Sequence, residues 1–201
     1  MMVSTTHSCK KLHHKLFRCI GIFFICIFLF HAINAKADEA TVSHVEILPE
    51  EKQYVVNANV EFELNQRLNE ALLHGIALHF VAEFVVESPR WYWFDLNISK
   101  STINYRLSYI PITKSYRLSI GGIHRNFESL EEAVAILKNI KSWSVLEKNQ
   151  LKPDESYNVA FRWRLDTSLL PRPFQVTSAI GSRDWQLATE WSRWQFRPQN
   201  Q

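Results

Sequence analysis

Hydrophobic and polar residues alternate along several stretches of the 201-residue chain. In residues 54–64 every second residue is apolar, and Asn or Glu fills most positions between them. The same period of two recurs in residues 76–86 and 157–165. Because successive side chains of a strand point to opposite faces of a sheet, this pattern predicts antiparallel strands with one buried face. Residues 76–86 are mostly apolar on their second face too, which predicts a central strand covered on both sides.

A repeated tetrapeptide predicts a hairpin. Tyr-Arg-Leu-Ser occurs at residues 105–108 and again at 116–119, with Pro111 between the copies. Two strand-like segments that flank a turn residue at this spacing are typical of paired β-strands. We therefore expect the copies to be the arms of one hairpin, with aromatic residues on one face and Arg106 or Arg117 on the other.

Composition predicts the remaining extended segments. Residues 91–96 are rich in aromatic residues, which favour strands. Residues 143–146 are predicted as a short strand, and residues 185–196 as a closing strand pair or one long bent strand. Two prolines in residues 170–174 predict an extended segment, because each fixes its own φ and restricts the residue before it.

Two short helices are expected. Asn65 is a suitable N-cap for a helix over residues 66–74, and Gly75 suits the left-handed position that follows a helix. A helix over residues 129–141 begins with Ser-Leu-Glu-Glu, which is a capping box, and continues with apolar residues at helical spacing.

These elements predict the fold class. Seven to nine strands and two helices occur without an alternating strand–helix rhythm, so a parallel sheet is not expected. The sequence predicts a mainly-β protein, an antiparallel β-sandwich that is either immunoglobulin-like or a curled sheet, with two short helices in the connections. We expect a single β-rich domain over residues 38–201.

Residues 1–37 differ in composition from the rest of the chain. They contain five basic residues, no acidic residue and an apolar run over residues 19–30. Small residues follow at Ala35 and Ala37, the positions that a signal peptidase recognises. We predict a signal peptide that is cleaved after Ala37, and therefore export to the periplasm.

The alternative is an uncleaved leader that anchors the protein in the inner membrane through residues 19–33. A membrane-spanning helix needs about 20 predominantly apolar residues, and this stretch is shorter, so cleavage is favoured. Contact with a membrane is expected only through the leader, if it is retained.

Removal of the leader changes the charge and the cysteine content. Without its five basic residues, the 23 Lys and Arg of the chain fall to 18 against 20 Asp and Glu, a net charge of about −2. The isoelectric point of 8.8 therefore reflects mainly the leader, and we exclude nucleic acid as a partner. The three cysteines all precede residue 27, so the mature domain has no disulfide, cysteine nucleophile or thiolate metal site.

No catalytic or metal-binding motif is recognisable, so we predict a non-enzymatic protein without cofactor or metal. The unusual feature is seven tryptophans in the predicted mature domain. Trp163 shares a face with other apolar residues and is expected in the core, whereas other tryptophans neighbour polar residues. Exposed indoles and arginines would provide contact area and charge for a ligand, although a core and rim rich in aromatic rings is the favoured explanation of the tryptophans. The candidate binding-surface residues are Trp91, Trp93, Arg106, Arg117, Arg162, Arg164, Trp191 and Trp194.

Several ordered motifs resemble a known family. They are the basic leader, Trp-Tyr-Trp-Phe-Asp at 91–95, the two Tyr-Arg-Leu-Ser copies, Phe-Glu-Ser-Leu-Glu-Glu-Ala at 127–133, Arg-Trp-Arg-Leu-Asp at 162–166, Leu-Pro-Arg-Pro-Phe-Gln-Val at 170–176 and the Trp-rich end. Together they resemble a family of exported proteobacterial proteins that is described as a domain of unknown function. The resemblance implies no catalytic residues. It implies a link to a membrane sensor kinase, because genes of the family lie near such kinases.

Three functional hypotheses follow. The first is a non-enzymatic binding or accessory domain of the cell envelope, whose partner is an envelope protein or a sensor domain. The second is a glycan- or peptidoglycan-binding module that uses exposed tryptophans. The third is a hydrolase whose site is assembled from residues distant in sequence.

Overall fold

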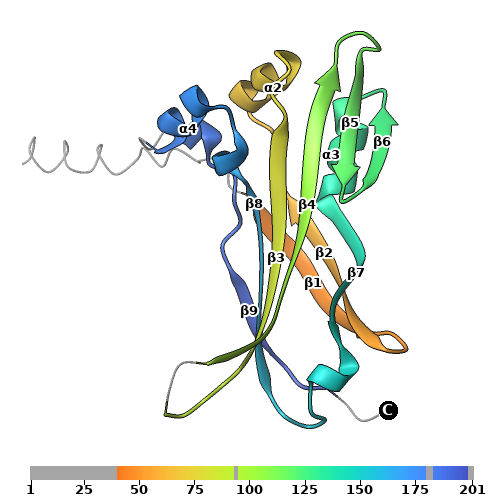
Figure 1. The fold of residues 1–201 in the computed structure, drawn as a ribbon, viewed down its shortest axis with the longest axis vertical. Coiled ribbons are helices and arrows are strands. Elements are labelled where there is room, and N and C mark those ends of the chain that lie inside the picture. The colour runs from red at the N-terminus through yellow and green to blue at the C-terminus, as the bar shows by residue number, and fades with distance from the viewer. Residues whose placement is uncertain (1–39, 93–94, 180–182, 199–201) are drawn as a thin grey trace, which may run out of the picture. The chain divides into compact units, whose positions relative to one another are not determined.

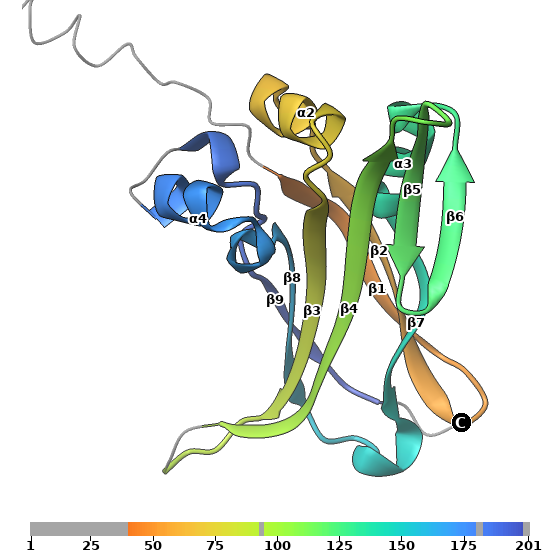
Figure 2. The same ribbon diagram turned by 45° about the horizontal axis from the view of Figure 1, so that its top comes forward.

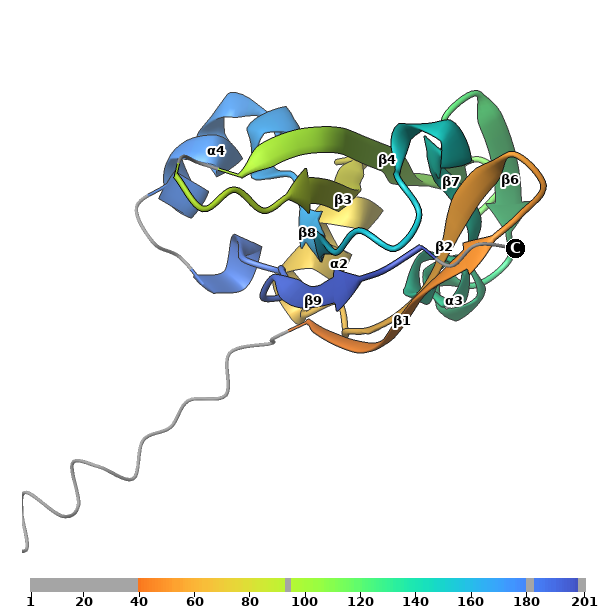
Figure 3. The same cartoon turned by 90° about the horizontal axis from the view of Figure 1, so that it is seen from below.

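Two antiparallel sheets contain the nine strands of the computed structural model, which describes residues 40–92, 95–179 and 183–198. The smaller sheet has the order β1–β2–β7, and the larger has the order β6–β5–β4–β3–β8–β9. The strands are β1 (Thr41–Pro49), β2 (Gln53–Glu61), β3 (Leu78–Ser88), β4 (Leu96–Ile110), β5 (Ser115–Ile120), β6 (Ile123–Phe127), β7 (Asn139–Glu147), β8 (Tyr157–Leu165) and β9 (Ser192–Phe196). The larger sheet lies in front of the smaller one in Figure 1, and Figure 3 shows how it curls from β4 to β9. The predicted mainly-β, antiparallel sandwich is confirmed.

Alternation along β2, β3 and β8 places one row of side chains from each strand between the sheets. In β8, buried and half-buried residues alternate without interruption from Tyr157 to Leu165, as the sequence predicts. β3 lies between β4 and β8 and is therefore a central strand. Burying a large apolar side chain contributes about 1.5–3 kcal/mol, so these rows account for much of the stability. The inward residues include Tyr54, Val56, Ala58, Val60, Phe80, Phe84, Phe161 and Trp163.

Stacked aromatic rings join the two sheets in the core. The ring centroid of Phe62, which follows β2, lies 4.2 Å from that of Trp163 in β8. Trp163 in turn lies 5.0 Å from Phe80 in β3. Aromatic pairs of this kind contribute about 0.5–1.5 kcal/mol beyond the area they bury. Residues 38–201 contain no cysteine, so packing of this kind holds the domain together without disulfides.

Two of the three α-helices in the described part of the chain begin where the sequence predicts. The helices are α2 (Gln66–Leu73), α3 (Leu130–Lys138) and α4 (Arg172–Ala179). The Asn65 side chain accepts a hydrogen bond from the Leu68 amide at 3.0 Å, and Gly75 follows α2 with a φ of +83°. The Ser129 hydroxyl accepts from the Glu132 amide at 3.2 Å. Figure 2 shows α3 beside β5, where it contacts β2, β5, β6 and β7 and fills one end of the space between the sheets.

Helix α4 replaces the extended segment that was predicted for residues 170–174. Pro171 precedes the helix and Pro173 lies in its first turn, where a missing N–H costs no intrahelical hydrogen bond. The amides of Phe174 and Gln175 donate to the Pro171 carbonyl at 2.9 and 3.3 Å. The prolines therefore start a helix here, and the prediction was wrong.

The predicted helix over residues 129–141 extended three residues too far at its C-terminal end, because α3 ends at Lys138. β7 already begins at Asn139. The residues that follow show the burial pattern of a strand rather than that of a helix. Both Ile140 and Trp143 point into the core although they are three positions apart, and a bulge at Ser142 with a φ of +49° makes this possible. A bulge adds one residue to a strand and restores the inward direction of the next side chain.

The described residues of the aromatic segment 91–96 that precede Leu96 are not in a strand. β4 begins only at Leu96, and Pro89 ends β3 because it has no N–H for the sheet. Trp91 and Tyr92 are 94% and 65% exposed, so they make few contacts with the sheets. The two residues in the middle of this segment lie outside the described residues.

The edges of the sheets contain elements that the alternation pattern does not predict. β1 and β6 are mostly exposed edge strands without a buried row of side chains. The closing segment, residues 185–196, contains one strand, β9, in place of a strand pair. Before β9, the chain pairs with the end of β8 only through isolated bonds, including the Thr189 amide to the Trp163 carbonyl at 2.8 Å.

The outward side of β3 differs from the prediction of a strand covered on both sides. No helix of the described residues crosses in front of β3, β4 and β5 in Figure 1. Val81 is nevertheless only 6% exposed, and its cross-strand neighbours are Arg164 and Asn104. Because long side chains lay their apolar stems over a sheet, neighbouring residues cover this face in place of a second layer.

The predicted leader, residues 1–37, lies outside the described residues. Its cleavage and the export of the chain therefore stay predictions, as does the boundary of the domain at residue 38. Within residues 40–92, 95–179 and 183–198, no helix combines the length and the hydrophobicity that crossing a bilayer requires.

Candidate functional site

Six basic side chains project from the outward side of the larger sheet, a surface that we call the basic face. They are Lys100, Arg106, Arg117, Arg162, Arg164 and Arg193, which alternate with the inward residues of β4, β5, β8 and β9. At outward positions of the described strands the acidic residues are Glu83 and Glu87, and Asp166 directly follows β8. Because residues 38–201 have a net charge of about −2, this face concentrates positive charge in a domain that is slightly acidic as a whole.

Arg164 is held by two carboxylates. Its Nε lies 3.3 Å from Glu83 Oε2, and its Nη1 lies 3.4 Å from Asp166 Oδ1. Burial would raise the pKa of the Asp166 carboxyl, but hydrogen bonds from Ser168 and the charge of Arg164 outweigh it, so the pKa is lowered. Arg164 therefore has a structural role within the basic face and is less free than its neighbours to meet a ligand.

An indole ring organises two further arginines. The guanidinium carbon of Arg162 lies 5.7 Å from the ring centroid of Trp191, and that of Arg193 lies 5.9 Å from the same ring. Cations at this distance are attracted to the negative face of an aromatic ring. The Nε of Arg162 is buried and has no hydrogen-bond partner among the described residues. This cluster holds two positive charges next to each other on β8 and β9.

Arg106 and Arg117 project from the β4–β5 hairpin, as the repeated tetrapeptide predicts, and both are exposed. Arg106 makes no ion pair within the described residues, and Arg117 donates from Nε to Asn126 Oδ1 at 3.0 Å. Across the sheet, burial and then the charge of Arg106 lower the pKa of His79, against a smaller opposing effect of Asp166. These two arginines are the most accessible cations of the basic face.

The structure does not bring all the candidate tryptophans to this surface. Trp191 stacks with two arginines of the basic face, whereas Trp91 lies in the exposed connection between β3 and β4. Trp93 lies outside the described residues. Trp194 was expected at the surface, but it points inward and packs edge-on against Phe84 at 6.1 Å. Its position in β9 explains this, because Trp194 and the outward Arg193 are successive residues of a strand.

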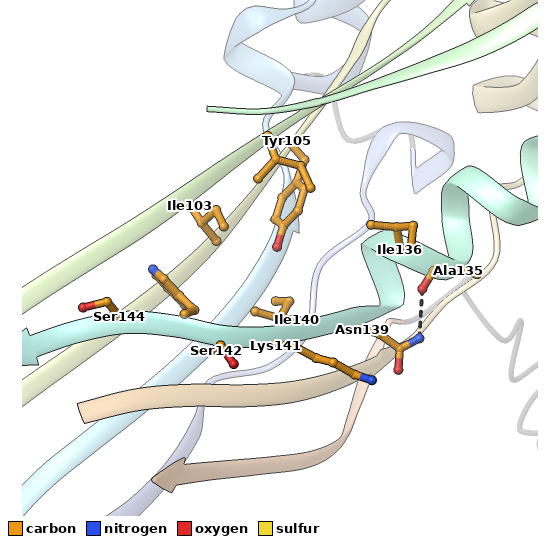
Figure 4. A pocket seen from close by; sticks show the side chains of 11 residues that line it. Ile103, Tyr105, Ala135, Ile136, Asn139, Ile140, Lys141, Ser142 and Ser144 are labelled. Atoms are coloured by element: carbon orange, nitrogen blue, oxygen red, sulfur yellow. Dashed lines mark hydrogen bonds between the residues drawn. The ribbon is translucent and has the colours of Figure 1, made fainter. Parts of the chain in front are cut away.

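A second feature, which the sequence did not predict, is a groove between the sheets. Its cavity volume is about 740 Å³, and its walls come from β4 and β5 on one side and from α3 and β7 on the other. Figure 4 shows Ile103, Ile136 and Ile140 around it, with the hydroxyl of Tyr105 pointing into the opening. No local pattern signals such a groove, because its opposite walls lie about 20 to 40 residues apart in the chain.

The histidines of the described residues make separate contacts. His124 Nδ1 lies 2.7 Å from the Ser119 hydroxyl, and His74 Nδ1 lies 2.6 Å from the Glu70 carbonyl oxygen. In the part of the chain that the structure describes, no three His, Cys, Asp or Glu side chains gather in a way that would hold a metal ion. The basic face and the groove are therefore the two candidate functional surfaces of the described residues.

Comparison with known proteins identifies one family. The model of a family described as Domain of unknown function (DUF4390) matches residues 37–195. The match covers most of the chain and includes every strand and helix except the last residue of β9. No curated protein and no solved structure matches the chain.

Proposed function

Because the chain belongs to the DUF4390 family, a family named without an activity, we propose its function from its surface. The protein is a non-enzymatic binding module of the cell envelope that recognises an acidic region of another envelope protein. The basic face is the contact surface. An extracytoplasmic sensor domain is the partner that the family resemblance favours.

The observation that carries this proposal is the segregation of charge. At the outward positions of the larger sheet's described strands, six basic residues stand against Glu83 and Glu87, with Asp166 just beyond β8, although the domain has more acidic than basic residues overall. Complementary potentials speed association and orient the partners. A basic face on a slightly acidic domain therefore selects for an acidic partner surface and directs it to one side of the molecule.

The arginine side chains also suit recognition by their geometry. Guanidinium groups bind carboxylates through two parallel hydrogen bonds, and Arg is enriched at protein interfaces. The stacking of Arg162 and Arg193 on Trp191 limits their rotation before binding. Pre-ordered side chains lose less entropy when a partner arrives.

Crosslinking followed by mass spectrometry in the native host tests this proposal. We expect the wild-type chain to be linked to an envelope protein, and the double variant Arg106→Glu with Arg117→Glu to lose that link. The matched control carries Lys52→Glu with Arg67→Glu, two exposed residues outside the basic face that change the net charge equally. The proposal fails if the partner is lost equally in both variants, or if the wild-type protein has no partner.

A specific observation favours glycan binding as a second candidate. The Trp91 indole is 94% exposed, and the Tyr92 ring meets it edge-on at 5.2 Å. Exposed aromatic rings provide flat apolar surfaces on which sugar rings stack. In this case peptidoglycan fragments quench tryptophan fluorescence in the wild-type protein but not in the Trp91→Ala variant, whereas an unchanged spectrum at millimolar ligand excludes this candidate.

A further inference from the structure

The groove between β4, β5, α3 and β7 has the chemistry of a ligand site that is separate from the basic face. We propose that it binds a single-chain amphiphile with a carboxylate head group, such as a fatty acid. The acyl chain lies among the isoleucines of the groove, and the carboxylate contacts Lys141 at the rim. This proposal does not depend on the proposed function of the basic face.

The walls of the groove are apolar but incompletely covered. Ile103 and Ile120 of the larger sheet and Ile136 of α3 are only half-buried, although each packs against the core. Ile140 and Trp143 of β7 complete the lining on the opposite side. A volume of about 740 Å³ lies within the roughly 300–1,000 Å³ of typical small-ligand sites. An acyl chain in this space removes apolar surface from water on both walls at once.

Tyr105 adds an unpaired polar group inside the groove. Its side chain is only 3% exposed, yet its hydroxyl has no hydrogen-bond partner among the described residues. Figure 4 shows this hydroxyl directed into the space between Ile103 and Ile140. The hydroxyl oxygen stays accessible through the groove, where an acceptor atom of a ligand can replace water as its partner. Burial also raises the pKa of Tyr105, which keeps the hydroxyl protonated and able to donate.

Charge at the rim selects the head group. Among the eleven residues that line the groove, Lys141 is the single charged one, and it forms no ion pair within the described residues. One ammonium group balances the single negative charge of a carboxylate. A phosphate monoester carries about 1.5 to 2 negative charges at neutral pH, for which Arg clusters are the usual partners. The groove provides no arginine.

The backbone next to the groove argues against an extended peptide as the occupant. β7 is an edge strand of the smaller sheet, and extended peptides can bind other proteins by adding to the free side of such a strand. However, Ser142 has a φ of +49° within a bulge of the β2–β7 pairing, which interrupts the regular ladder. Farther along β7, the Val145 carbonyl already accepts a hydrogen bond from the Ser99 hydroxyl at 3.0 Å. A small amphiphile forms no ladder of backbone hydrogen bonds, so it does not need a regular edge strand to bind.

Titration calorimetry with sodium dodecanoate, below its micelle concentration, tests this inference on the purified full chain as the host processes it. We expect saturable binding of one dodecanoate per chain. Lys141→Glu should weaken binding at least tenfold, whereas the control Lys52→Glu, an exposed lysine away from the groove, should leave it unchanged. Tyr105→Phe keeps the ring and should weaken binding roughly threefold to tenfold.

Other ligands and a second variant locate the site and identify its occupant. Ile136→Glu, at a half-buried position of α3, should abolish dodecanoate binding while the circular dichroism spectrum stays that of wild type. Neutral dodecanol should bind Lys141→Glu and wild type equally. The inference is overturned if folded wild-type protein does not bind dodecanoate, if dodecyl phosphate binds more tightly, or if an extended peptide binds the groove and dodecanoate does not. Equal affinity of wild type and Lys141→Glu for dodecanoate overturns it as well.

Discussion

The indole N–H of Trp163 has no hydrogen-bond partner among the described residues, although the side chain is fully buried. The ring stacks against Phe62 and Phe80 within the core. A buried donor without a partner costs about 1–3 kcal/mol. Packing of the Trp163 ring therefore stabilises the core, and its unpaired N–H cancels part of that stabilisation.

This balance predicts different effects for two substitutions of Trp163. Trp163→Ala removes the whole ring and should lower the free energy of unfolding by about 3–5 kcal/mol. Trp163→Phe keeps an aromatic ring and removes the unpaired donor, so its cost should stay below about 1.5 kcal/mol. Urea unfolding followed by far-ultraviolet circular dichroism measures both values. A Phe variant as unstable as the Ala variant would contradict this account of the core.

The environment of His79 predicts a pH dependence of stability. Burial and Arg106 lower its pKa in the folded protein, whereas the unfolded chain takes up a proton near pH 6.5. The unfolded state therefore binds more protons below that pH, and the free energy of unfolding decreases as the pH falls through about 6.5 towards the lower folded pKa. In His79→Gln this decrease between pH 7.5 and 5 should be smaller. An identical pH profile for the two proteins would rule out the contribution of His79.

At the scale of elements, one side chain adds to the isolated backbone bonds that join the segment before β9 to β8. The Thr189 hydroxyl accepts a hydrogen bond from the Trp163 amide at 3.0 Å, and the Thr189 amide donates to the Trp163 carbonyl at 2.8 Å. Thr189 is only 3% exposed, so water does not replace these bonds. The threonine therefore completes the edge of β8 where no regular strand pairs with it.

Replacement of Thr189 by an isostere tests this role. Thr189→Val leaves the Trp163 amide without an acceptor and should reduce the free energy of unfolding by about 1–3 kcal/mol. Thr189→Ser keeps the hydroxyl and should cost clearly less. Hydrogen exchange gives an independent measurement, since the Trp163 amide should exchange faster in the Val variant only. Equal stability of the Val and Ser variants would show that the hydroxyl does not stabilise this edge.

The elements also show which parts of the fold a sequence predicts. The strict alternation in β8 and the cap at Asn65 each depend on neighbouring residues, and both were predicted correctly. Residues 170–174 were not, because two prolines are compatible with either an extended segment or the first turn of a helix. β1 was missed because its stability comes from pairing with β2 rather than from its own pattern.

The candidate site also has features that depend on neighbouring residues and features that depend on distant ones, and only the former can be predicted from the sequence. The outward direction of Arg106, Arg117, Arg162 and Arg164 follows from local alternation, so the sequence predicts on which side of the sheet they lie. That they bind a partner stays a prediction. The groove depends on the separation between β4 and β7, which do not pair with each other, and no local pattern records that separation.

At the scale of the whole molecule, the aromatic contacts that link the sheets predict cooperative unfolding. Phe62 directly follows β2 of the smaller sheet and Trp163 lies in β8 of the larger sheet, so one sheet cannot separate without exposing the core of the other. We expect thermal unfolding to give one transition, with the same midpoint by tryptophan fluorescence and by far-ultraviolet circular dichroism. Two separated midpoints would indicate that the sheets unfold independently.

Because residues 38–201 contain no cysteine, thiol-reactive labels can be attached there at chosen positions only. Any thiol introduced into residues 38–201 is unique there, because the natural cysteines all lie before residue 27. A spin label attached through Lys141→Cys would report occupancy of the groove, and one attached through Arg117→Cys would report contacts of the basic face. The distance distribution between the two labels would then reveal whether filling one site changes the spacing of the strands that carry the other.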